Sequence, residues 1–173
     1  VFDLKSWRVE RFEISTLEVP DERVYAPLQA FRSLDDEHRQ LKIDLAGEPL
    51  VAAAPDSSKT LAAAGLADTS SLIGHTINGR DGSVGKVIDL LVNVDLWQLR
   101  YLVIESEKGH ALTDIEWCAS VGDGEQPPHI DLPAEAIAMA PPYRDLHELC
   151  SGYEAALYRH YTSRAYARNG RIA

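Results

Sequence analysis

The sequence predicts a mainly β fold: two small β-barrels, the first incomplete, followed by a C-terminal helix. Three observations predict it. The chain has 173 residues, of which 45% are apolar and 25% charged, enough for one or two small packed domains. Short stretches of β-branched and aromatic residues alternate with Gly, Pro and Asn turns. The chain also repeats itself weakly at an offset of 87 to 90 residues, which indicates two related domains rather than a solenoid.

The repeat is degenerate but long. Residues 24–55 align without a gap on residues 111–142, with identities at Ser33/Ser120, Asp36/Asp123, Ile43/Ile130, Asp44/Asp131, Leu45/Leu132, Glu48/Glu135, Ala53/Ala140 and Pro55/Pro142. At an offset of 90, Trp7 aligns with Trp97. The segment 72–90 that opens the second copy has no counterpart before Val1. We therefore expect either that native N-terminal residues are missing or that the first copy has lost this hairpin.

The clearest local element is a hairpin. Residues 72–77 and 84–92 are apolar stretches that flank residues 78–82, where Asn-Gly and Asp-Gly supply the positive φ angles of a tight turn. This predicts that Gly82 has a positive φ. Further strands are expected at 97–105, 111–118 and 129–132, and the repeat predicts matching strands at 7–15, 24–31 and 40–45.

Two helical segments follow. Residues 134–140 form at most two turns before Pro141 and Pro142 end them, and residues 148–167 have the strongest helical pattern. The predicted organisation is a partial first repeat at 1–55, a linker at 56–70, a second repeat at 71–142 and a helical tail at 143–173.

The tail helix has two interpretations. Tyr153, Leu157 and Tyr161 form one stripe, which is typical of a helix packed on its own domain. Aromatic and arginine side chains are also common in protein-binding surfaces, and they make a candidate partner surface of Tyr158, Arg159, Arg164 and Tyr166.

Charge and hydropathy limit the partners. The net charge is −10: residues 1–142 hold 12 basic and 24 acidic residues, whereas residues 143–173 are mildly basic. An acidic body repels phosphate backbones, so nucleic acid is not an expected partner of the body. No apolar run approaches the ~20 residues of a transmembrane segment. The two cysteines have no CxxC spacing, so we expect a cytoplasmic protein.

The segment LIGHTINGRDGSVGKVIDLLV (72–92), followed by Asp95–Trp97 and Arg100–Val103, resembles a PRC-barrel domain. This family is named for the cytoplasmic domain of the photosynthetic reaction-centre H subunit. The resemblance covers residues 71–137, with a weaker partial copy over 1–55, and it implies two PRC-type small barrels. The tail at 153–161 is similar to that of bacterial proteins with two such barrels. The resemblance to the PRC-barrel family implies structural roles, at turns and in strands, for its motif residues: Gly74, Asp81, Gly82, Gly85, Val87, Trp97 and Tyr101.

The resemblance implies binding rather than catalysis. We expect a non-enzymatic binding or adaptor protein that acts through protein–protein contacts, with no cofactor. One alternative is a modulator of electron and proton transfer in photosynthesis, like the reaction-centre H subunit, at the inner membrane face. Another is an adaptor in ribosome maturation or RNA processing.

Reactive side chains do not form a recognisable motif. A composite metal site of His110, Asp114, Glu116 and His129 would require their strands to pair. Cys118 is expected in the core, and Cys150 at the start of the tail helix. No catalytic, cofactor-binding or metal-binding residue is assigned.

An incomplete barrel exposes unpaired strand edges, which invite pairing with another chain. Two-fold symmetry pairs identical edges, so the sequence predicts a homodimer whose interface includes residues 7–15.

Overall fold

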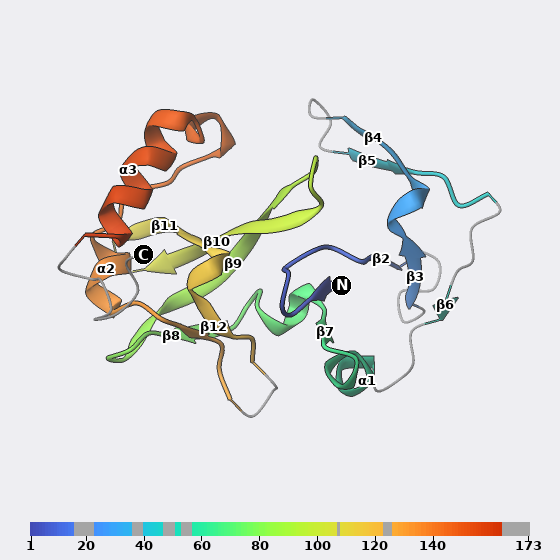
Figure 1. The fold of residues 1–173 in the computed structure, drawn as a ribbon, viewed down its shortest axis with the longest axis horizontal. Helices are drawn as coiled ribbons and strands as arrows, with labels where there is room; N and C mark the ends of the chain where they lie inside the picture. The colour runs from blue at the N-terminus through green and yellow to red at the C-terminus, as the bar shows by residue number, and fades with distance from the viewer. Residues whose placement is uncertain are drawn as a thin grey trace. The chain divides into compact units, whose positions relative to one another are not determined.

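The computed structural model describes residues 1–15, 23–35, 40–46, 51–52, 57–106, 108–122 and 126–163. The chain divides into two compact units (Figure 1): the first contains residues 1–68 and 96–98, and the second contains residues 69–95 and 99–173. The structure is mainly β, with one large mixed sheet and a C-terminal helix, which confirms the predicted fold class at this level.

The second unit is built on a six-stranded sheet with the order β11-β10-β9-β8-β13-β12. Strand β13 pairs with β8 in parallel, whereas β8 with β9, β10 with β11 and β12 with β13 are antiparallel. The strands are β8 (Thr76–Asn78), β9 (Ser83–Asn93), β10 (Gln98–Ser106), β11 (Gly109–Asp114), β12 (Cys118–Ser120) and β13 (His129–Ile130).

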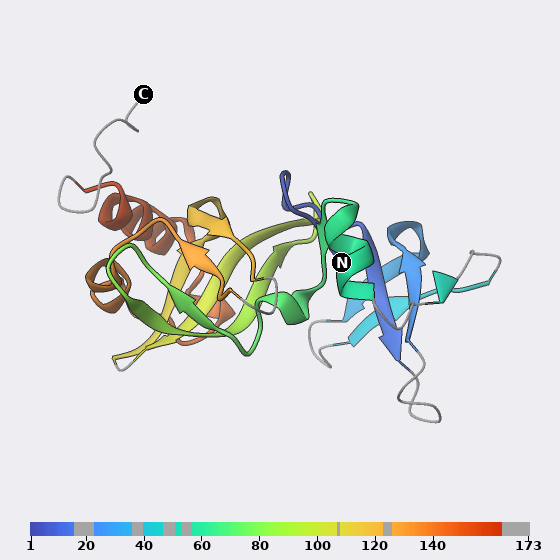
Figure 2. The ribbon, with the colours of Figure 1, turned by 90° about the horizontal axis from the view of Figure 1, so that it is seen from below.

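This sheet curls strongly. Strands β11 and β12 end the strand order on opposite sides, yet only the 3₁₀ helix η3 (Ile115–Trp117) separates them in the chain. Four residue steps span at most about 14 Å, so the two ends of the sheet must approach each other. Figure 2 shows this curvature. Among the described residues no ladder joins β11 to β12, so the sheet is curled but not closed by hydrogen bonds.

The core of the second unit lies between this sheet and the helices α2 (Ala134–Ala138) and α3 (Ser151–Tyr161). Two shorter 3₁₀ helices, η2 (Thr69–Ser71) and η4 (Leu146–Glu148), precede β8 and α3. Helix α3 begins three residues later than predicted, after Cys150 as its N-cap. Its core-facing side chains Leu157 and Tyr161 are buried, as are Leu72, Ile77, Val87, Leu99, Leu102, Ile104, Leu112, Ile130, Leu132 and Ile137.

The first unit distributes its strands over three small sheets, with the orders β2-β3-β6, β4-β5 and β1-β7. Helix α1 and strand β7 lie within the segment 56–70 that the sequence suggested as a linker. The elements are β1 (Phe2–Asp3), β2 (Arg11–Ser15), β3 (Arg23–Pro27), η1 (Leu28–Ala30), β4 (Phe31–Asp35), β5 (Gln40–Ile43), β6 (Val51–Ala52), α1 (Ser57–Ala63) and β7 (Leu66–Ala67).

The two units repeat the same strand register. Strands β4 and β5 pair Phe31 with Ile43 and then shift register, and β12 and β13 pair Cys118 with Ile130 with a shift at the same place. The 3₁₀ helices η1 and η3 also coincide at the offset of 87. One hydrogen bond recurs: the Asp44 amide donates to the Ala30 carbonyl at 2.8 Å, and its equivalent joins residues 131 and 117 at 2.8 Å. Residues 28–44 and 115–131 therefore share the same strand register and the same 3₁₀ turn, as the repeat predicts for this part of the chain.

The units differ where the second has its hairpin. Strand β8 joins β13 to β9 and thereby unites all six strands in one sheet. Among the described residues of the first unit no strand joins β5 to β2, and the strands remain in separate sheets. The repeat predicts burial of Leu45 as well as Leu132, but Leu132 is 0% exposed and Leu45 is 37% exposed. That prediction is wrong for the first copy, because none of the described strands lies beside β5 in the way that β8 lies beside β13.

Two local predictions also need correction. The first hairpin strand was expected over 72–77, whereas β8 covers only Thr76–Asn78, because residues 69–75 form η2 and turns. Trp97 was expected in a strand, but it is the last residue of the turn before β10, with a φ of +48°. Trp7, its equivalent in the first copy, shares this conformation with a φ of +58°.

Candidate functional site

The predicted glycine turn holds together the hairpin and helix α2. The Gly79 amide donates to the Gly82 carbonyl at 2.7 Å, and Gly82 has a φ of +149°, which confirms the predicted positive φ. Asp81 Oδ1 accepts a hydrogen bond from the Ala134 amide at 2.7 Å. This contact with the first turn of α2 joins residues 53 positions apart, and the sequence alone did not indicate it.

Arg80, between these turn residues, contacts the segment after β13. Its amide donates to the Leu132 carbonyl at 2.9 Å, and its Nε donates to Asp131 Oδ1 at 2.8 Å. Both side chains of this ion pair are largely covered, at 27% and 16% exposed. The turn is thus fastened to the end of β13 by a backbone hydrogen bond and an ion pair.

Three further motif residues lie along the hairpin. Gly74 has a φ of +89°, and its amide donates to the Val87 carbonyl at 2.8 Å, while the Val87 side chain is fully buried. Gly85 has a φ of +156°, and a Cβ atom there would collide with the Glu105 carbonyl oxygen on β10. Gly85 therefore allows the backbone of β9 to lie close to that of β10.

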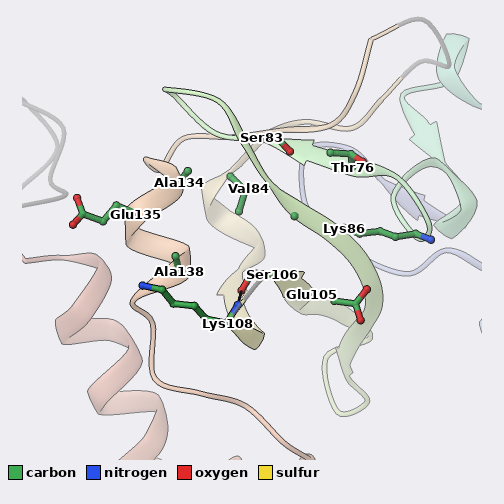
Figure 3. A pocket seen from close by; sticks show the side chains of 11 residues that line it. Thr76, Ser83, Val84, Lys86, Glu105, Ser106, Lys108, Ala134, Glu135 and Ala138 are labelled. Atoms are coloured by element: carbon green, nitrogen blue, oxygen red, sulfur yellow. Dashed lines mark hydrogen bonds between the residues drawn. The ribbon is translucent and has the colours of Figure 1, made fainter.

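A pocket of about 690 Å³ opens beside this close approach (Figure 3). It is lined by side chains from β8, β9, β10 and α2, with Lys86, Lys108, Glu105 and Glu135 as its charged groups. The Lys108 Nζ donates to the Met139 sulfur at 3.2 Å, and Glu105 lies 4.0 Å from His110. These opposite charges balance, so the pocket offers neither a concentrated anion site nor a paired acid and base.

A second hollow, of about 640 Å³, lies between β9, β10 and the segment before α3. The Tyr101 hydroxyl donates to Glu154 Oε1 at 2.8 Å, and the Arg100 guanidinium lies 5.4 Å from the Tyr101 ring centre. Burial raises the pKa of the Tyr101 phenol, with smaller effects from Arg100 and Glu154. Tyr101 remains a neutral donor at neutral pH, so this arrangement fastens α3 to the sheet.

Trp97 lies in an aromatic cluster of the first unit. Its ring meets Phe12 edge-on at a centroid distance of 5.3 Å and Phe31 at 4.9 Å. The Trp97 carbonyl accepts a hydrogen bond from the Val9 amide at 2.7 Å, and the backbones of Arg8 and Gln98 form an isolated antiparallel β-bridge. The turn that ends at Trp7 and the turn that ends at Trp97 are equivalent in the repeat, and the residues at these two turns contact each other through this hydrogen bond and bridge. Trp97 therefore has a packing role.

The tail helix packs on its own unit. Tyr161 donates its hydroxyl proton to the Leu112 carbonyl at 2.7 Å, and the Tyr153 hydroxyl donates to the Pro141 carbonyl at 2.9 Å. On the opposite side, Tyr158 is 71% exposed and Arg159 Nε donates to the Ala155 carbonyl. The other two members of the candidate partner surface, Arg164 and Tyr166, lie outside the described residues.

The composite metal site is not assembled. Strands β11 and β13, which carry His110 and His129, are separated by three strands in the sheet order. His110 and Asp114 lie near opposite ends of β11, about 13 Å apart at 3.3 Å per residue. Throughout the described ranges, no three His, Cys, Asp or Glu side chains are grouped so as to hold a metal ion.

The cysteines lie where the sequence placed them. Cys118 is buried, and burial raises the pKa of its thiol to about 12, so it is protonated and unreactive at neutral pH. Cys150 is exposed at the start of α3.

A row of partly exposed apolar side chains lies on the first unit. Leu41, Ile43 and Leu45 alternate along β5 and its extension and share one face, and we call them the β5 row. Leu41 is 40% exposed, Leu45 is 37% exposed and Ile43 is half-buried. The equivalent residues of the second unit are all buried: Pro128, Ile130 and Leu132. The repeat thus has apolar residues at the same positions in both copies but buries all three only in the second.

No protein-family model matches the chain, and no curated protein matches it. In the part of the chain that the structure describes, no helix has both the length and the apolar character needed to cross a membrane.

Proposed function

We propose that the chain is a non-enzymatic binding protein built from two PRC-type barrels, the first incomplete, and that it acts through protein–protein contacts. The observation that carries this proposal is the β5 row. Its residues are apolar like their buried equivalents, yet Leu41 and Leu45 are exposed and Ile43 is only half-buried. Among the described strands, β5 pairs with β4 alone. Exposed apolar groups at a sheet edge are typical of interaction surfaces.

The rest of the molecule supports a binding role. The two pockets described above hold balanced charges or structural hydrogen bonds, and the motif residues act in turns and packing. The PRC-type assignment is supported by the curled sheet, the hairpin with its glycines and the repeated corner at η1 and η3.

Comparative affinity purification tests the proposed function. The tagged wild-type chain is compared with Leu41→Lys, which places a charge in the β5 row, and with Met139→Lys. Met139 is a matched control because it is apolar and 55% exposed, but lies on the second unit. We expect partner proteins that co-purify with wild type and Met139→Lys and are lost with Leu41→Lys. Identical partner sets for all three chains would contradict the proposal.

Self-association is a separate part of the proposal. The predicted homodimer remains a prediction, and sedimentation equilibrium at micromolar concentration tests it. A dimer supports two-fold closure of the open edges, and a concentration-independent mass of 19.1 kDa contradicts it.

A further inference from the structure

We propose that the β5 edge of the first unit binds a β-hairpin of a partner protein, in the way that β13 holds the hairpin β8–β9. This inference rests on the proposed binding function and specifies the chemistry of the partner. The occupant has a strand that runs parallel to β5, an apolar side chain facing the β5 row, and a cationic side chain in its turn.

The strand geometry supports a hairpin at this edge. In the second unit, the Asn78 amide donates to the Pro128 carbonyl at 2.9 Å, and the Arg80 amide donates to the Leu132 carbonyl at 2.9 Å. At the offset of 87, these two acceptors correspond to Leu41 and Leu45. Because β4–β5 and β12–β13 share their register and its shift, β5 presents the same edge as β13.

The hydrophobic row supports an apolar strand. Ile77 and Val87 of the hairpin are fully buried, and so are Ile130 and Leu132 on and after β13. The first unit has Ile43 and Leu45 at those positions. A strand added beside β5 would remove these side chains from water, which is the main favourable contribution to such pairing.

The negative charge of Asp44 is the reason to expect a cationic side chain in the turn of the partner's hairpin. Its equivalent, Asp131, holds Arg80 of the hairpin turn at 2.8 Å. Asp44 pairs instead with Arg32 on β4 at 3.2 Å, and both side chains are about half-exposed, at 47% and 51%. The exposed ion pair holds its partners weakly, so an incoming cation can replace Arg32 at small cost.

A disulfide-closed hairpin peptide that has the apolar strand residues and the cationic turn residue provides the test. The probe is a fluorescein-labelled peptide of residues 73–88 with a cysteine added at each end, joined by a disulfide to hold the hairpin. The ends are close in the native hairpin, since the Val87 amide donates to the His75 carbonyl at 3.0 Å. Fluorescence anisotropy measures its binding to the full chain, and circular dichroism verifies the folds of peptide and variants.

We expect saturable one-to-one binding that weakens roughly tenfold with Asp44→Asn, as for loss of one charge-assisted hydrogen bond. Asp95→Asn, at an exposed turn residue, is the matched control and should leave affinity unchanged. Replacing Arg80 by Gln in the peptide should weaken binding to wild type but have little further effect on Asp44→Asn, which identifies the two as partners.

Three outcomes would overturn the proposal. One is no binding of the folded peptide. Another is binding that survives Asp44→Asn but falls with Asp131→Asn, which would place the peptide in the second unit. The third is self-association that Leu41→Lys abolishes without any peptide binding, which would identify a second copy as the occupant. If partners still depend on Leu41 while the peptide fails, the proposed function stands and only the hairpin inference falls.

Discussion

Two buried tyrosines differ in how their hydroxyl groups are satisfied. Tyr161 donates to the Leu112 carbonyl at 2.7 Å and lies 3.2 Å from the Thr113 hydroxyl. Tyr25, which is 5% exposed, has no hydrogen-bond partner for its hydroxyl among the described residues. A buried polar group is costly without a partner, so the same substitution should have opposite effects at the two positions.

We expect Tyr161→Phe to reduce the free energy of unfolding by about 1–2 kcal/mol, because it leaves buried acceptors unsatisfied. Tyr25→Phe should raise the stability by up to about 1 kcal/mol, because it removes an unpaired hydroxyl. Urea unfolding measures both. Equal destabilisation by the two substitutions would show that Tyr25 has a partner, such as an ordered water.

Two hairpin glycines share a positive φ but differ in their surroundings. A Cβ at Gly82 would meet nothing within 4 Å, whereas one at Gly85 would collide with the β10 backbone. Gly82→Ala should therefore cost only the backbone strain, about 1 kcal/mol. Gly85→Ala should cost roughly 2–4 kcal/mol, since steric overlap adds to the strain. Thermal unfolding measures the difference, and equal melting temperatures would contradict the close approach of β9 and β10.

At the scale of elements, helix α2 depends on a distant carboxylate. Its N-cap Pro133 supplies no side-chain hydrogen bond, and Asp81 of the hairpin turn accepts from the Ala134 amide instead. Asp81 therefore acts as the cap of a five-residue helix that is too short to be stable by itself.

We expect Asp81→Ala to destabilise the second unit by about 1 kcal/mol, the usual cost of losing a cap. Hydrogen exchange should accelerate at the amides of α2, whereas Asp95→Ala in the next turn should leave them unchanged. Unaltered exchange in both variants would show that the Asp81 contact does not hold the helix.

Sequence patterns predicted the elements well where local chemistry decides them. Asn78-Gly79 and Asp81-Gly82 located the hairpin turn, and Pro141 ended the helical segment close to where α2 stops. The patterns failed where tertiary contacts decide. Trp97 has strand-like composition, but its turn conformation accompanies packing against Phe12 and Phe31. No local signal reveals that partner set.

The candidate site could be predicted only in part. The repeat placed Ile43 and Leu45 opposite Ile130 and Leu132, and residues 72–90 were visible as a segment without a counterpart in the given sequence. Exposure of the β5 row could not be deduced, because apolar residues at alternating positions normally indicate burial. Whether such residues are covered depends on a neighbouring strand remote in the chain.

For the whole molecule, buried acids predict a loss of stability at alkaline pH. Burial raises the pKa of the Cys118 thiol to about 12 and that of the Tyr153 phenol to about 12. It also raises the pKa of Tyr161. The folded state therefore favours the neutral forms. Their contribution is fully present below the unfolded pKa values of about 9 and 10, and is lost as the pH rises towards the folded values.

We expect the melting temperature to change little between pH 7 and 8.5 and to fall progressively above about pH 9. Differential scanning calorimetry from pH 7 to 11 measures this. Tyr153→Phe should make the decline shallower by removing one of the titrating groups. A melting temperature constant up to pH 11 would contradict burial of these groups.

The membership of Leu96–Gln98 in the first unit has a consequence for biosynthesis. A ribosome delivers residues 1–68 first, but the first unit lacks the indole of Trp97 until about thirty more residues have been made. At about 5–20 residues per second, that delay lasts a few seconds. During this delay, Phe12 and Phe31 cannot pack against the Trp97 ring, because Trp97 has not yet been synthesised. The first unit therefore completes its packing only after translation of the β9–β10 turn.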